Sequence, residues 1–95
     1  MKASDDRRSV ELEIINRLGL HARAAARFVS VASDHQSTID VHFAGQTANG
    51  KSIMGLMMLA AAKGSTLSVT ATGDDAKQAL KALEALLADR FGEPD

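Results

Sequence analysis

Cysteine is absent from this chain of 95 residues, and histidine occurs only three times. Without cysteine the chain can form no disulfide and can use no thiol chemistry. The histidines are His21, His35 and His42, which are scattered along the chain, and neither His35 nor His42 has a metal-ligand spacing or a paired carboxylate. Because zinc sites draw on cysteine and clustered histidine, the sequence argues against a metal centre. We expect His35 and His42 to be surface residues.

Aromatic residues and excess basic charge are also scarce. The only aromatic residues are three phenylalanines, and 11 Lys and Arg against 12 Asp and Glu give a formal net charge of −1. Nucleic-acid binding usually depends on a basic excess or on aromatic stacking platforms. We therefore expect no nucleic-acid partner.

Long hydrophobic runs are missing as well. The longest apolar stretch, residues 53–62, is interrupted by Gly55 and is too short to span a bilayer. The charged segment 1–8 lacks the apolar centre of a secretory signal. We therefore expect no membrane partner and a cytoplasmic location.

The apolar residues that are present suffice for one small core. They make up 45% of the chain, and its length suits one domain. The polar composition of residues 1–8 predicts a disordered tail. The single domain is expected over residues 9–92.

Hydrophobic periodicity predicts seven elements of secondary structure. Strict alternation of apolar and polar residues indicates half-buried strands, and spacing by three and four residues indicates amphipathic helices. The expected elements are a strand at 10–15, a helix at 21–32, strands at 39–43 and 46–48, a helix at 53–61, a strand at 67–71 and a helix at 75–90. Gly64 suits the position just after the second helix.

This element order predicts an α/β (α+β) open-faced sandwich. Alternating strands bury one face, and three amphipathic helices can cover that face of an antiparallel sheet. The order is β-α-β-β-α-β-α. The pattern alone does not separate the possible strand orders, a ferredoxin-like arrangement among them.

The most informative residues are Gly19-Leu20-His21-Ala22-Arg23, at the predicted start of the first helix. A helix N-terminus offers unpaired backbone N–H groups and a positive dipole, and so favours an anion. His21 would place a nucleophile there, and Arg23 can donate to phosphate oxygens. The dipole also disfavours an imidazolium, which leaves the ring a free lone pair. On local chemistry alone, a histidine before a helix is more often a cap or a surface residue.

Two stretches resemble the signatures of the histidine-containing phosphocarrier proteins (HPr) of the bacterial phosphotransferase system. The first is Gly19 to Arg23, followed by a small-residue helix with Phe28 and Val29. The second, Lys51-Ser52-Ile53-Met54-Gly55-Leu56-Met57 through Gly64, is similar to the signature around the family's regulatory serine. The resemblance extends over roughly residues 9–91.

The resemblance implies a function and partners. His21 would accept a phosphoryl group on Nδ1 from phosphorylated enzyme I and pass it to a histidine of an enzyme IIA component. The backbone amides of Ala22 and Arg23, with the Arg23 side chain, would stabilise phosphoryl charge. The family needs no metal or cofactor in the carrier itself, and it has strand order 1-4-2-3. We find no obvious dimer seam and expect a monomer.

The second predicted helix should present an apolar face to partner proteins. Methionines at helical spacing are often core residues, but Leu56, Leu59 and Ala60 can supply the buried stripe. The expected interface comprises Ala26, Arg27, Ile53, Met54 and Met57. Basic residues are expected around it: Arg17, Arg23, Arg27 and Lys51. A partner should therefore carry acidic groups there.

Ser52 has two interpretations. As an N-cap it would satisfy a backbone N–H at the start of the second helix. In Gram-positive members of the resembling family, the matching serine is phosphorylated by a dedicated HPr kinase/phosphorylase. A phosphate there would repel acidic docking surfaces and inhibit transfer at His21.

Two features depart from the usual family pattern. The family usually has proline where this chain has Ala24, so one backbone N–H is restored and the first helical turn is less rigid. We expect the activity to persist with an altered rate. The spacing of Asn16, Gly19 and His21 is similar to the nitrogen-related branch, whose proteins regulate metabolism without moving sugar.

The function inferred is that of a phosphocarrier in phosphoenolpyruvate-dependent phosphotransfer. The alternative is a regulatory binding module, switched by phosphorylation at His21 or Ser52 without sugar transport. An independent turnover enzyme is disfavoured because a single reactive histidine lacks a second acid–base partner.

Overall fold

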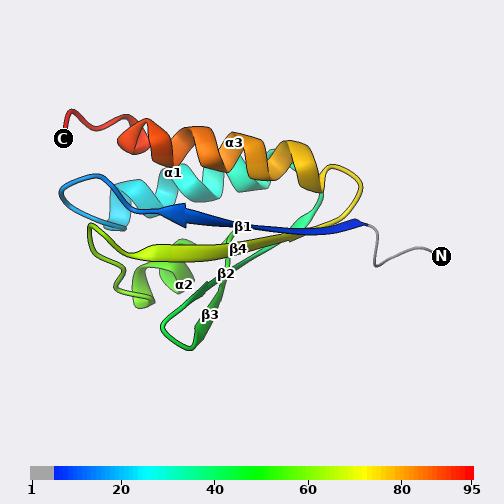
Figure 1. Cartoon of the computed structure of the whole chain (residues 1–95), viewed down its shortest axis with the longest axis horizontal. Helices are drawn as coiled ribbons and strands as arrows, with labels where there is room; N and C mark the ends of the chain where they lie inside the picture. The colour runs from blue at the N-terminus through cyan, green and yellow to red at the C-terminus, as the bar shows by residue number, and fades with distance from the viewer. Residues whose placement is uncertain (1–5) are drawn as a thin grey trace.

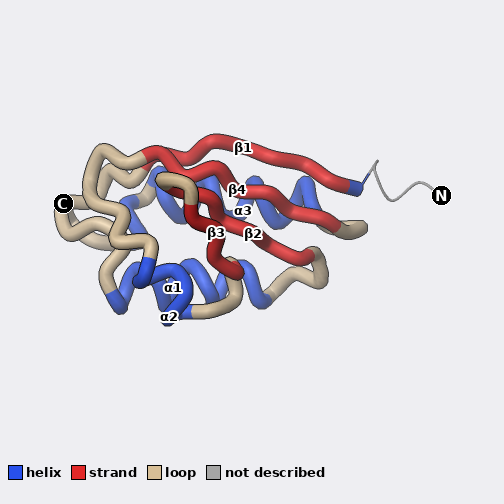
Figure 2. Tube along the Cα trace, turned by 90° about the horizontal axis from the view of Figure 1, so that it is seen from below, coloured by secondary structure: helices blue, strands red, loops and turns tan. Residues whose placement is uncertain are grey.

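The computed structural model of the chain describes residues 6–95. The described elements are β1 (Arg7–Glu13), α1 (Ala22–Ser33), β2 (Thr38–Phe43), β3 (Gln46–Asn49), α2 (Ile53–Met58), β4 (Thr66–Thr72), α3 (Ala76–Ala88) and the short 3-10 helix η2 (Arg90–Gly92). The four strands form one antiparallel sheet in the order β1-β4-β2-β3, seen in Figure 2. The predicted element order, and the strand order that the family resemblance implied, are confirmed.

One face of the sheet forms the core and the other stays polar. Antiparallel pairing sets Leu12 opposite Leu67, and Val69 between Val10 and Val41. Successive side chains of a strand point to opposite faces, so the neighbours of these residues lie on the other side. There the hydroxyl groups of Ser9 and Thr70 pair at 2.8 Å.

Three helices pack against the apolar face. Helices α1 and α3 lie alongside each other, α3 contacts β1 and β4, and α2 contacts α1 and β3 (Figure 1). Small side chains let the helices pack closely. The buried alanines of these helices are Ala24, Ala25 and Ala32 of α1 and Ala76 and Ala79 of α3. Larger side chains fill the remaining space, with Phe28, Phe91 and Leu83 fully buried. Val29 of α1, next to Phe28, is only partly buried. Over residues 6–95, no helix has the length and apolar character needed to cross a bilayer.

The predicted boundary of the N-terminal tail is wrong by two residues. Arg7 and Arg8, assigned to the tail, belong to β1 and pair with Thr72 and Ala71. Backbone hydrogen bonds between strands do not require apolar side chains, so pairing with β4 extends β1 to residues outside its alternating apolar pattern. The pattern alone therefore missed Arg7 and Arg8. Residues 1–5 of the predicted tail lie outside the described residues.

Helix α2 ends three residues earlier than predicted. Leu59 is its C-cap, and Ala60 takes a left-handed conformation with φ +54°. The turn exposes Ala60, expected in the buried stripe, and buries Ala61 in its place. Ala61 then accepts a hydrogen bond from the Leu20 backbone at 3.0 Å. This hydrogen bond to a distant segment takes the place of a further helical turn. Gly64, predicted to lie just after the helix, therefore does not follow it directly.

The last helix also stops before its predicted end at Arg90. Helix α3 ends at Ala88, and Arg90 and Phe91 both have φ +55°. The left-handed turn directs the Phe91 ring into the core, where it is fully buried. Burial of a large aromatic side chain offsets the cost of this backbone conformation. Residues 93–95 are thereby turned back toward the start of α1.

Candidate functional site

The loop before α1 is shaped by Gly19. Its φ of +70° is in the left-handed region, and its N–H donates to the Asn16 carbonyl at 3.2 Å. A Cβ at this position would lie 2.8 Å from the Ala61 carbonyl oxygen. Glycine is therefore required both by the conformation and by the close approach of the backbone after α2. The loop holds His21 at the entrance to α1.

His21 is the N-cap of α1, as its position in the sequence predicts. Its backbone is extended, its carbonyl accepts from Ala25 at 2.8 Å, and its Nδ1 accepts from the Arg23 backbone N–H at 3.3 Å. The side chain is 28% exposed. One nitrogen of the ring thus faces the positive end of the helix, where orphan N–H groups favour an anion.

The other ring nitrogen meets a residue that the sequence analysis missed. His21 Nε2 pairs with Glu93 Oε2, across 72 positions of the chain. The expectation that His21 lacks an acid–base partner is therefore wrong. Glu93 follows a helix in a short terminal segment, and no periodicity or spacing links it to His21. Only the left-handed turn at Arg90 and Phe91 brings it there.

Glu93 is held from a second side by Asn16. Asn16 is fully buried, and its Nδ2 donates to Glu93 Oε1 at 3.0 Å and to the Gly19 carbonyl at 2.8 Å. Its Oδ1 has no hydrogen-bond partner within residues 6–95, which is the consequence of directing the amide nitrogen at two acceptors. Asn16 therefore ties the glycine turn to the C-terminal segment.

The pKa of Glu93 reflects opposing effects. Partial burial raises the pKa of this carboxyl, whereas hydrogen bonds from Asn16 and His21, and the charges of His21 and Arg27, lower it. The lowering effects prevail, so the pKa of Glu93 lies below its usual range. Glu93 is a carboxylate near neutral pH.

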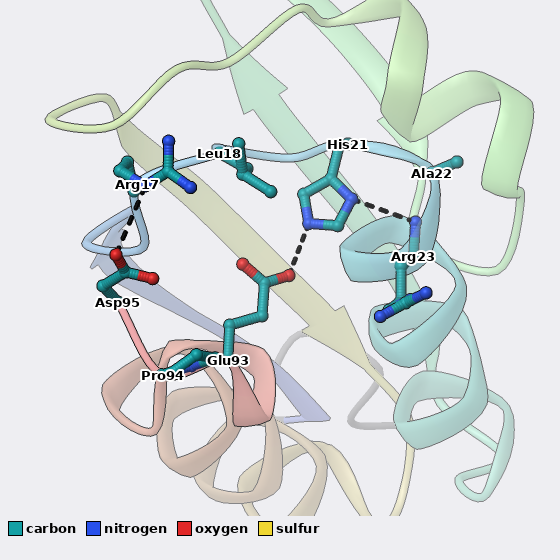
Figure 3. A pocket seen from close by; sticks show the side chains of 8 residues that line it. All are labelled: Arg17, Leu18, His21, Ala22, Arg23, Glu93, Pro94 and Asp95. Carbon is teal, nitrogen blue, oxygen red and sulfur yellow. Dashed lines mark hydrogen bonds and ion pairs between the residues drawn. The ribbon is translucent and has the colours of Figure 1, made fainter.

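A cavity of about 630 Å³ opens beside the ring. It is lined by the turn at 17–18, by residues 21–23 and by residues 93–95 (Figure 3). Arg17 Nε pairs with Asp95 Oδ2 at 3.3 Å, whereas the side chain of Arg23 projects from α1. The cavity is therefore lined by His21, Ala22 and Arg23, three residues of the predicted site, and also by Glu93 and Asp95.

The second predicted helix has the two faces that were expected. Ile53, Met54 and Met57 are 42%, 73% and 43% exposed, whereas Leu56 and Leu59 are buried. Met58, which was not assigned to either face, is exposed as well. Ala26 is exposed on α1, the helix that packs on α2.

The basic residues expected around this surface are spread more widely. The guanidinium of Arg27 donates to the Phe91 carbonyl through Nη1. Lys51 Nζ donates to the carbonyl of His35, which follows the C-terminal end of α1, the end opposite His21. Arg17 and Arg23 lie at the cavity.

Ser52 and the other histidines lie apart from the cavity. Ser52 is the N-cap of α2, and its Oγ accepts from the Gly55 N–H at 3.0 Å. His35 pairs with the Val31 carbonyl, and His42 with Thr47 on the polar face of the sheet. In the part of the chain that the structure describes, no cluster of three or more acidic, histidine or cysteine side chains could hold a metal ion.

Comparison with known proteins points to one family. A family model described as the PTS HPr component phosphorylation site matches residues 8–89. The chain is 50% identical over 82 residues to the phosphocarrier protein HPr of Neisseria meningitidis serogroup A, covering 86% of this chain and 92% of that protein.

Solved structures agree with the sequence comparison. HPr from Thermoanaerobacter tengcongensis superposes with a TM-score of 0.88 at 44% identity, covering 93% of this chain and 99% of that one. An HPr dimer from the same organism superposes with a TM-score of 0.74 at 46% identity, covering 88% and 97%. Because one of these similar proteins is a dimer, the monomer expected here stays a prediction.

Proposed function

This chain belongs to the HPr family of the phosphotransferase system, and on that premise we propose that His21 is the residue on which it carries the phosphoryl group. Its role is that of a phosphocarrier protein. That role does not require the nitrogen-related branch, since the named relatives are phosphocarrier proteins HPr. We further propose that enzyme I is the donor, that an enzyme IIA component is the acceptor, and that both meet the protein in the cytoplasm.

The observation that carries this proposal is the position of the His21 ring. Nδ1 accepts from the Arg23 backbone N–H in the first turn of α1, and the ring borders the open cavity. In the transfer, the Nδ1 lone pair attacks phosphorus, the bond between phosphorus and the donor nitrogen breaks, and its electron pair returns to the donor. Helix amides and Arg23 are placed to stabilise the charge on the phosphoryl oxygens.

The same arrangement suits docking of a partner histidine. The exposed side chains of Ile53, Met54 and Met57 lie on α2, which packs on α1. Flexible methionine side chains adapt to more than one surface, as a carrier with a donor and an acceptor requires. Arg17 and Arg23 at the cavity favour acidic groups on each partner.

Regulation through Ser52 is a separate proposal. Its hydroxyl caps α2, the helix that carries the exposed methionines. A phosphate on Ser52 would add about two negative charges beside this surface and repel acidic partners. A kinase of the HPr kinase/phosphorylase type would be the partner that adds it.

Phosphorylation by enzyme I and phosphoenolpyruvate tests the central proposal. Mass spectrometry should find one added phosphate that is labile in acid and stable in alkali, as phosphohistidine is. His21→Ala should abolish the gain. His35→Ala and His42→Ala are matched controls and should accept phosphate as the parent does. Phosphorylation of the His21→Ala protein by enzyme I would overturn the assignment.

A further inference from the structure

The geometry points to Glu93 as a positioning residue for phosphoryl transfer at His21, an inference that rests on the proposed function. The residue acts through the imidazole ring and does not itself contact the attacking nitrogen. Its carboxylate touches Nε2, whereas the proposed acceptor atom is Nδ1 on the other side of the ring.

The contacts at the two ring nitrogens fix the tautomer of His21. An ionised carboxylate only accepts hydrogen bonds, so Nε2 must carry the proton that binds Glu93 Oε2. On the opposite side, the Arg23 backbone N–H donates to Nδ1 at 3.3 Å, so Nδ1 presents its lone pair. Both contacts select the same tautomer, with the nucleophilic lone pair on Nδ1.

Glu93 is itself held in place by its neighbours. Its side chain is 12% exposed, and Asn16 Nδ2 binds Oε1 at 3.0 Å. The segment before it is anchored by the buried ring of Phe91, whose carbonyl accepts from Arg27. Each carboxylate oxygen thus has its own donor, and the ring cannot turn without breaking one of the two contacts at its nitrogens.

The Glu93 carboxylate also offsets the charge that develops on the ring during the reaction. When Nδ1 bonds to phosphorus while Nε2 keeps its proton, the ring gains a positive charge. The carboxylate beside Nε2 offsets that charge, as the aspartate does for the imidazolium in hydrolase triads. When the acceptor protein takes the phosphoryl group, the bond between Nδ1 and phosphorus breaks, and its electrons restore the neutral ring.

Three arginines lie near the pair formed by His21 and Glu93. Arg17, in the loop before α1, is engaged by Asp95. Arg27, from α1, lies close enough to lower the pKa of Glu93, and Arg23 lines the cavity on the side of Nδ1. Of the charged side chains at this site, that of Glu93 is the one that contacts the imidazole ring.

Substitution by glutamine separates positioning from simple packing. E93Q keeps the size of the side chain but offers one acceptor oxygen for two donors, Asn16 Nδ2 and His21 Nε2. If its amide nitrogen faces the ring, it favours the tautomer with the proton on Nδ1. E93A removes both contacts. E84Q, at an exposed glutamate of α3, is the control for a change in net charge.

Three measurements on the full chain test the inference. E93Q and E93A should accept phosphate from enzyme I about tenfold to a hundredfold more slowly, the range seen when the partner that orients a histidine ligand is removed. Long-range ¹H–¹⁵N spectra should show the proton of His21 on Nε2 in the parent and a larger share on Nδ1 in E93Q. In ³¹P NMR titrations, the phosphorylated ring should lose its Nε2 proton at a lower pH, by about one pH unit, in both variants. E84Q should match the parent throughout.

The outcomes separate this inference from the proposed function. If E93Q and E93A match the parent in rate, tautomer and titration, Glu93 does not position the ring, and His21 can still be the acceptor. If the rates fall while tautomer and titration stay unchanged, the role of Glu93 is structural and the inference is overturned. Phosphorylation of His21→Ala would instead overturn the proposed function.

Discussion

Gly19 is the residue whose backbone conformation decides where the His21 ring lies. Its φ is left-handed, and a Cβ there would approach the Ala61 carbonyl oxygen to 2.8 Å, so a side chain has no room. Asn16 holds the same turn from the other side, because its amide donates to both the Gly19 carbonyl and Glu93. The site therefore depends on residues that take no part in the chemistry.

Substitution of this glycine tests its two roles separately. Gly45 also has a positive φ, +79°, but nothing lies within 4 Å of the position that a Cβ would take. Gly45→Ala should therefore lower the free energy of unfolding by about 1 kcal/mol through backbone strain alone. Gly19→Ala should lower it by about 3 kcal/mol, because steric overlap adds to the strain. Urea denaturation measures both changes, and equal losses would show that the contact with Ala61 is unimportant.

At the scale of elements, α2 divides its six residues between the core and the solvent. Leu56 is fully buried, and Met54 is the most exposed of the large hydrophobic residues within 6–95. This division was predictable, because helical spacing needs only the residues of one turn on either side. The end of the helix was not predictable from the sequence, because it depends on a contact with a distant loop. The chain turns at Ala60, and the next carbonyl, that of Ala61, accepts from the Leu20 N–H.

Two truncations within α2 test the proposed docking surface. Leu56→Ala should lower the free energy of unfolding by about 2–5 kcal/mol, because it empties a buried site. Met54→Ala should change it by less than about 0.5 kcal/mol and should weaken binding to enzyme I. Denaturation and calorimetric titration measure these effects. A large stability loss in Met54→Ala with unchanged affinity would assign the methionine to the core.

At the scale of the whole molecule, Asp75 connects the start of α3 to the loop before β2. Its carboxylate accepts from the backbone N–H groups of Gln36 and Ser37 at 2.9 and 3.0 Å, and from the Ser37 hydroxyl. The Ser37 hydroxyl and then the Gln36 N–H lower the pKa of Asp75 from 3.8 to about 2. Asp75, predicted to begin the last helix, is the N-cap residue of α3, and its carbonyl accepts from the Ala79 N–H at 2.9 Å. Its side chain binds the loop before β2 and makes no cap hydrogen bond to α3.

This linkage predicts a specific loss of stability in acid. Because the pKa of Asp75 is lower in the folded state, its carboxylate stabilises the fold above pH 3.8, and the contribution disappears as the pH falls toward about 2. Urea denaturation between pH 6 and 2 should show a smaller decline for Asp75→Asn than for the parent. Asp74→Asn, at the exposed neighbour, is the control and should follow the parent curve. A parent-like decline in Asp75→Asn would contradict the linkage.

The sequence alone determined the properties that depend on near neighbours along the chain. Alternation identified the four strands, and helical spacing identified the three helices and the exposed face of α2. The Gly19–Arg23 stretch placed His21 at the start of a helix. The order of the strands came from the resemblance to a family, because hydrophobic alternation is the same whichever strands are adjacent.

Only the tertiary structure decided the contacts between distant segments. Arg7 and Arg8 join β1 because β4 offers them partners, and Glu93 reaches His21 because Arg90 and Phe91 turn left-handed to bury an aromatic ring. No local pattern encodes such contacts, since they depend on where two elements lie after the whole core has packed. The nucleophile was therefore visible in the sequence, whereas the carboxylate that orients it was placed by the fold.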